Sequence, residues 1–258
     1  MTNEIQVWNK VLTSAMQMPG VKVDRDAFLA EKLYPYSTSD QLSTAIEKGP
    51  IGVTSIDVLD TIAQECISRH TWLVTSSSAA LGIPGGFAML GTVPGDVAQY
   101  YYHVFVLAQK LAYIYGYPDL CDEHGNFTES ASSLLTVFVG IMSGVGVANK
   151  VIQELAEQFQ KEVIRRLPRY ALTKTFFYPI IKQIAKWIGI SLTKQSFAKG
   201  VSKFVPILGG IVSGGLTYKT FKPQSKKLMF KLRNTMLLAY ENKKKENLNN
   251  SDDDSQKS

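Results

Sequence analysis

The chain of 258 residues has little of what stabilises small secreted proteins. It contains only 2 Cys, Cys66 and Cys121, which stand alone and far apart, so a disulfide scaffold is excluded and a reducing cytosol is favoured. Charged residues make up 19% of the chain and hydrophobic residues 45%, which excludes a disordered protein. The first residues include Glu4 and no uninterrupted apolar stretch follows them, so we expect no signal peptide.

Segments with the alternating pattern of β-strands are also missing. Apolar residues instead recur at helical spacing, which predicts helices over 5–17, 55–69, 96–117, 151–167 and 225–240. The expected fold class is therefore all-α, a single helical domain of about ten helices with a glycine-rich apolar core hairpin. We expect short N-terminal helices over 1–54, the main helical domain over 55–240, and a charged, disordered tail over 241–258.

Three stretches carry no formal charge, 71–95, 130–149 and 204–218. The stretch 130–149 has the length of a bilayer crossing, but serines, threonine and three glycines interrupt it, so we interpret it as two packed helical pieces. The helix expected over 96–117 is apolar around nearly its whole circumference. Such a helix lies either at the centre of a core or in lipid.

Basic and acidic residues are unevenly distributed along the chain. Residues 1–150 carry 8 basic and 14 acidic side chains, whereas residues 151–258 carry 20 and 8. The excess is largest over 161–245, with 19 basic and two acidic residues. A field of this sign attracts polyanions, either anionic lipid or nucleic acid. The alternative is a solvated basic face that serves solubility or balances the charge of the acidic half of the molecule.

Two segments carry a resemblance to a known family. Residues 82–120 combine a Gly-Gly turn, an apolar stretch, a Pro-small-acid step and an aromatic-Gly-aromatic end. Residues 197–223 combine a basic stretch, Val-Pro, a second Gly-Gly turn and small residues. In this order, across 55–240, they resemble the EcsC family of bacterial proteins. The motif positions are Gly85, Gly86, Pro94, Asp96, Tyr115, Gly116, Tyr117, Pro206, Gly209, Gly210 and Gly214.

The resemblance implies a helical fold and no established reaction or cofactor. The family is named for a protein encoded beside an ABC transporter. Gly95 stands where the family often has alanine between the proline and the acid, which argues against a chemical role for this turn.

Charge and apolar segments together predict a non-enzymatic accessory protein. We expect it to dock peripherally on the inner face of the cytoplasmic membrane, beside a transporter or another membrane protein complex. Each Lys or Arg near an anionic surface contributes about 1 kcal/mol. We expect no sequence-specific nucleic acid partner, because no DNA-binding motif is present. The expected membrane-binding side chains are Lys226, Lys227, Lys231, Arg233, Lys243, Lys244 and Lys245.

Two alternatives stay open, an enzyme of unknown reaction and an effector that inserts its apolar hairpin into a bilayer. The catalytic candidates are Asp96 and His103, which lie seven residues apart on one face of the predicted helix. A carboxylate and an imidazole in one pocket can transfer a proton. The structural alternative is that Asp96 caps the helix and His103 is a hydrogen-bonded core residue.

We expect no metal and no cofactor. Cys121 and His124 have the spacing of half a zinc site, and Cys66 and His70 supply the other half only if the fold brings the two pairs together. The glycine-rich turns lack the phosphate-loop pattern and do not follow a strand, so they do not predict a nucleotide site.

Overall fold

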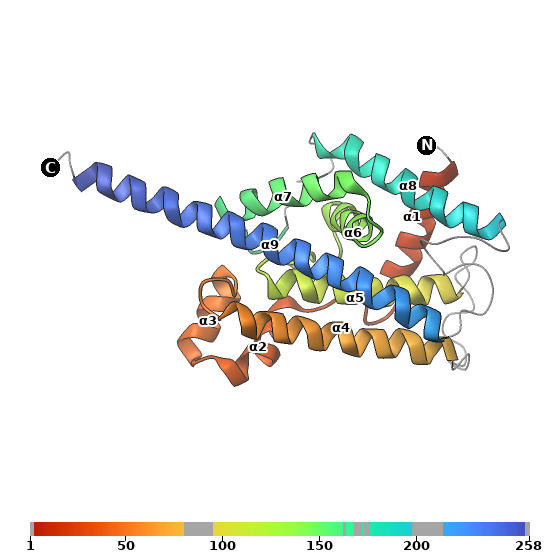
Figure 1. Cartoon of the computed structure of the whole chain (residues 1–258), viewed down its shortest axis with the longest axis horizontal. Coiled ribbons are helices and arrows are strands. Elements are labelled where there is room, and N and C mark those ends of the chain that lie inside the picture. Colours follow the sequence, from red (N-terminus) through yellow and green to blue (C-terminus); the bar gives the residue numbers. More distant parts are fainter. Residues whose placement is uncertain are drawn as a thin grey trace.

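The computed structural model describes residues 3–79, 95–161, 164–167, 172, 176–197 and 214–255. Within these ranges it contains nine α-helices, one 3-10 turn and no strand, which confirms the all-α class (Figure 1). The elements are α1 (Asn3–Met16), α2 (Arg25–Leu33), η1 (Tyr34–Tyr36), α3 (Ser39–Lys48), α4 (Ile56–Ala79), α5 (Gly95–Ile114), α6 (Glu129–Met142), α7 (Gly146–Lys161), α8 (Phe177–Phe197) and α9 (Gly214–Ser255).

Helix α5 is the central helix of the bundle. It packs against α1, α2, α4, α6 and α9, and its residues are buried along most of its length from Val97 to Ile114. The helix that is apolar on nearly all sides is therefore a core helix. Helices α4 and α9 pack closely against each other and against α5, and Figure 1 shows them running across the front of the bundle.

The uncharged stretch 130–149 forms two helical pieces, as the sequence predicts. Helix α6 ends at Met142 and α7 begins at Gly146, with Gly144 at φ +81° between them. Gly140 allows α6 to approach α8, because a Cβ at this position would lie 2.7 Å from Cγ2 of Ile184. In the part of the chain that the structure describes, no helix combines the length and the apolar content needed to span a membrane.

Gly116 ends α5 with a left-handed cap. Its φ of +84° is a conformation that glycine adopts readily. The amide of Gly116 donates to the carbonyl of Tyr113, and the amide of Tyr117 donates to that of Ala112, each over 3.0 Å. This pair of hydrogen bonds is the Schellman motif. The aromatic-Gly-aromatic motif therefore has a structural role in this fold.

The tyrosines on either side of Gly116 fasten the end of α5 to two other helices. The hydroxyl of Tyr115 donates to Oδ1 of Asp60 on α4 over 2.8 Å. The hydroxyl of Tyr117 shares a hydrogen bond of 2.8 Å with that of Thr235 on α9. Both tyrosine rings are fully buried, so their hydroxyls need partners inside the protein.

Two helices extend beyond their predicted limits. Helix α4 continues to Ala79 rather than ending at residue 69, and α9 covers 214–255 rather than 225–240. The tail predicted to be disordered is thus helical over 241–255. Residues 241–250 are almost all exposed, so burial does not hold them; the lysines and glutamates over 241–246 are good helix formers and extend a helix that already exists.

Several motif positions lie outside the described residues, namely Gly85, Gly86, Pro94, Pro206, Gly209 and Gly210, and with them the glycine-rich hairpin. Gly214 is the first residue of α9. Figure 1 shows that α4 ends, α5 begins, α8 ends and α9 begins at the same end of the molecule.

Candidate functional site

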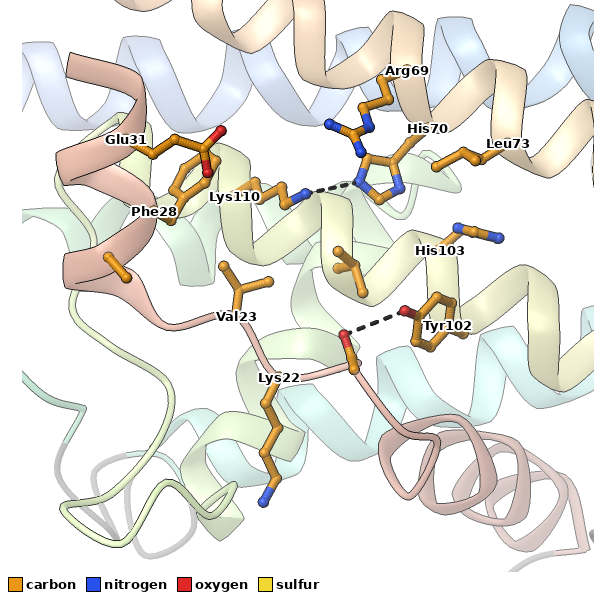
Figure 2. A pocket seen from close by; sticks show the side chains of 13 residues that line it. Lys22, Val23, Phe28, Glu31, Arg69, His70, Leu73, Tyr102, His103 and Lys110 are labelled. Atoms are coloured by element: carbon orange, nitrogen blue, oxygen red, sulfur yellow. Dashed lines mark hydrogen bonds between the residues drawn. The ribbon is translucent and has the colours of Figure 1, made fainter. Parts of the chain in front are cut away.

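A pocket of about 410 Å³ opens between α2, the loop before it, α4 and α5 (Figure 2). Helix α5 contributes Tyr102, His103 and Lys110, which lie on one side of the helix and are only partly buried, whereas most of α5 is fully buried. Helix α4 contributes Arg69 and His70. The pocket is therefore the groove where the one polar stripe of α5 meets a polar turn of α4.

His70 and Lys110 point toward each other across this groove (Figure 2). Nζ of Lys110 lies 3.3 Å from Nε2 of His70. A lysine ammonium has donors only, so Nε2 accepts and the proton of the neutral imidazole sits on Nδ1. Among the described residues, that Nδ1 has no hydrogen-bond partner although it is buried.

The imidazole of His103 lies beside that of His70. The ring centroids are 5.8 Å apart and the ring planes make an angle of 67°. Nδ1 of His103 is also buried and has no hydrogen-bond partner within the described part of the chain. The expectation that His103 is a hydrogen-bonded core residue is therefore not met at its Nδ1 atom.

Burial and neighbouring cations keep both imidazoles neutral. Burial, helped by Lys110, His103 and Arg69, lowers the pKa of His70 from 6.5 to about 3. Burial and the charge of Lys110 lower the pKa of His103 to about 4. Burial also lowers the pKa of Lys110 itself. The positive charge of the groove comes from Lys22, Arg69 and Lys110 rather than from the histidines.

Acidic side chains neutralise the positive charge of the groove only weakly. Glu31 on α2 lines the pocket, but its carboxylate accepts a hydrogen bond of 2.8 Å from Lys32, which lowers the pKa of Glu31. No acidic side chain of the described residues forms an ion pair with Arg69 or Lys110. The pocket is therefore suited to an anion.

The catalytic candidates of the sequence are only partly brought together. His103 lines the pocket, whereas the side chain of Asp96, in the first turn of α5, lies outside the described residues. The sequence interpretation missed Arg69, Lys110 and the place of His70 in this pocket. The signal was present in the spacing of polar residues along an otherwise apolar helix.

The proposed halves of a zinc site do not form a metal cluster. Cys66 and Cys121 are buried, and burial raises the pKa of both thiols, that of Cys121 to about 11. His124 is exposed beside Glu123. Across the described ranges, no group of three His, Cys, Asp or Glu side chains could hold a metal ion.

The seven basic residues expected to bind a membrane differ in their surroundings. Arg233 is paired with Asp60, Lys231 is partly buried, and Lys243 donates to the carbonyl oxygen of Gln160. The other four are exposed, namely Lys226, Lys227, Lys244 and Lys245.

Exposed apolar side chains lie among these four lysines. Phe230 is 52% exposed and Leu238 is 46% exposed. At 100° per residue, all six positions fall within about 120° of the circumference of α9. Residues 214–245 carry nine basic side chains and one acidic side chain, Glu241. We call this set the α9 surface: Lys226, Lys227, Phe230, Leu238, Lys244 and Lys245.

Comparison of the chain with models of protein families, with curated proteins and with solved structures finds no match. The resemblance to the EcsC family stays a prediction that rests on the motifs quoted above.

Proposed function

We propose that the chain is a non-enzymatic accessory protein that docks peripherally on the anionic inner face of the cytoplasmic membrane through the α9 surface. The observation that carries the proposal is the composition of α9 on its free side over 226–245, where four exposed lysines and two large apolar residues lie together with one exposed acid, Glu241. The motif resemblance, which points to membrane machinery such as a transporter, agrees with this role.

Two physical contributions add up on such a surface. Each lysine near anionic headgroups contributes about 1 kcal/mol at low ionic strength. Phe230 and Leu238 leave water when they enter the headgroup region, which favours binding independently of salt. Together they give reversible attachment of a helix that lies along the surface.

Vesicle co-sedimentation tests the proposal. We expect the protein to bind vesicles that contain phosphatidylglycerol, to bind phosphatidylcholine vesicles much less, and to dissociate as salt rises. The double variant Lys226→Gln/Lys227→Gln loses about 2 kcal/mol of binding free energy, roughly a thirtyfold change in affinity.

The matched control is Lys182→Gln/Lys186→Gln on α8. Both of these lysines are exposed, so the control changes the net charge equally on a different helix. An equal loss of vesicle affinity in the two double variants contradicts docking through the α9 surface. So does an absence of binding to anionic vesicles at low salt. Release of an entrapped dye would instead favour the membrane-inserting effector.

A further inference from the structure

Positive charge and an apolar wall meet in the pocket between α2, α4 and α5, and no residue of the α9 surface lines this pocket. We infer that this pocket binds a small phosphate monoester, with the phosphate held by Arg69 and Lys110 and the remainder of the ligand against the apolar wall. This site goes beyond membrane docking and does not depend on it.

Charge favours a dianion. Arg69 and Lys110 come from neighbouring helices and line the same pocket (Figure 2). A guanidinium offers two parallel N–H donors to a phosphate, and an ammonium adds a point charge. Neither cation is neutralised by an ion pair within the described residues. A monocarboxylate, with a single negative charge, would neutralise less of this positive charge than a phosphate monoester does.

Two neutral histidines lie beside these cations in the wall of the pocket. His70 is 3% exposed, and its ring already uses Nε2 as the acceptor for Lys110. Nδ1 of His70 and Nδ1 of His103 both lack partners among the described residues. Both atoms are shielded from the surface of the groove, so the histidines shape its wall and leave the anion to Arg69 and Lys110.

The rest of the lining selects a ligand with an apolar part. Val23 lies in the loop before α2 and Phe28 lies on α2, while Leu73 lies on α4 and Val106 on α5. The volume of about 410 Å³ falls within the usual range of small-molecule sites. Phenyl phosphate, which joins a dianion to an aromatic ring, is therefore a suitable probe.

Isothermal titration calorimetry with the full chain tests the site. We expect phenyl phosphate to bind more tightly than inorganic phosphate, and benzoate to bind least. Arg69→Gln weakens phenyl phosphate at least roughly tenfold because a charge-assisted hydrogen bond is lost. Arg69 is exposed, so this variant is expected to keep its fold. Lys110→Met has the same effect or a larger one.

Lys48→Met is the matched control, because Lys48 is an exposed lysine at the end of α3 and does not line the pocket. It should leave the affinity unchanged. Absence of binding by phenyl phosphate overturns the inference. An equal loss in Lys48→Met and Arg69→Gln also overturns it, since binding would then follow net charge alone.

The phosphate monoester can come from a free small molecule or from the headgroup of phosphatidate, and vesicles separate these sources. If the headgroup is the source, phosphatidate vesicles bind more protein than phosphatidylglycerol vesicles of equal charge, and Lys110→Met removes the difference. If a free molecule is the source, the two vesicles bind equally while phenyl phosphate still binds in solution. Failure of the α9 surface in the vesicle experiment leaves the calorimetric result unaffected.

Discussion

Arg233 of α9 holds the carboxylate of Asp60 on α4, with Nε 2.9 Å from Oδ2 and 3.0 Å from Oδ1. The two side chains are 26% and 21% exposed, so water screens this pair only in part. Oδ1 also accepts the hydrogen bond from Tyr115 at the end of α5. One carboxylate thus joins three elements of the core, and Arg233 is not free to bind a membrane.

We therefore expect Asp60→Asn to destabilise the protein. The substitution leaves Arg233 without its counter-charge and weakens the hydrogen bond of Tyr115, at a cost of about 1–3 kcal/mol in the free energy of unfolding. Urea denaturation measures the change. Glu65→Gln is the control, because Glu65 is an exposed acid on the same helix and forms no ion pair within the described residues. If both variants lose the same free energy of unfolding, the ion pair between Arg233 and Asp60 contributes nothing specific to stability.

Much of this fold follows from local patterns in the sequence. The apolar circumference of 96–117 predicted a helix that is now seen at the centre of the core, and the glycines near 144 predicted a break between two helices. Both features depend on neighbouring residues only. The extension of α9 past residue 240 was missed, because a polar sequence is compatible with an exposed helix as well as with disorder.

The pocket was harder to predict for a physical reason. His103 on α5 was already a candidate from the sequence. His70 and Arg69 reach the pocket from α4, which packs against α5 only in the folded protein. Pairing between helices depends on the rotation of each helix about its axis, and periodicity alone does not set this rotation. The partner of Arg233 was missed for the same reason, since Asp60 lies far away in the sequence.

Gly140 provides a test of close packing between α6 and α8. In Gly140→Ala the new Cβ would lie 2.7 Å from Cγ2 of Ile184 and 3.1 Å from Cβ of Ala148, so the helices must separate. We expect a loss of about 1–3 kcal/mol in the free energy of unfolding. Gly146→Ala is the control, because its Cβ would meet nothing within 4 Å and alanine favours the helix. A thermal melt that ranks Gly146→Ala below Gly140→Ala contradicts the packing described here.

Stability should fall as pH falls below neutrality. Since His70 and His103 have pKa values lowered from 6.5 to about 3 and about 4, the unfolded chain binds protons that the folded chain does not. The groups that face His70 are Lys110 and His103 on α5 and Arg69 on its own helix, and the cations among them oppose protonation further. The free energy of unfolding therefore decreases from pH 6.5 downward.

Urea denaturation between about pH 7.5 and about pH 5 measures this slope before most carboxylates titrate. The variant His70→Gln should show a smaller slope than the wild type, because one of the two buried imidazoles is gone. His124→Gln is the control, since that side chain is 76% exposed and does not line the pocket, and it should keep the wild-type slope. A slope in His70→Gln as steep as that of the wild type would show that His70 is not buried in its neutral form.

Phe230 separates apolar contact from charge on the α9 surface. The side chain is 52% exposed and packs little in the free protein, so Phe230→Ser should leave the free energy of unfolding within about 0.5 kcal/mol of the wild type. Its transfer into the headgroup region contributes about 1 kcal/mol, so the variant should bind anionic vesicles roughly fivefold more weakly. Because this contribution is not electrostatic, the loss should persist at high salt, where the effect of Lys226→Gln/Lys227→Gln shrinks.

Tyr34→Ser, at an aromatic residue of η1 that is 75% exposed, is the control and should bind as the wild type does. Equal losses in Phe230→Ser and Tyr34→Ser would mean that any exposed ring serves, and the orientation of α9 toward the lipid would then be wrong.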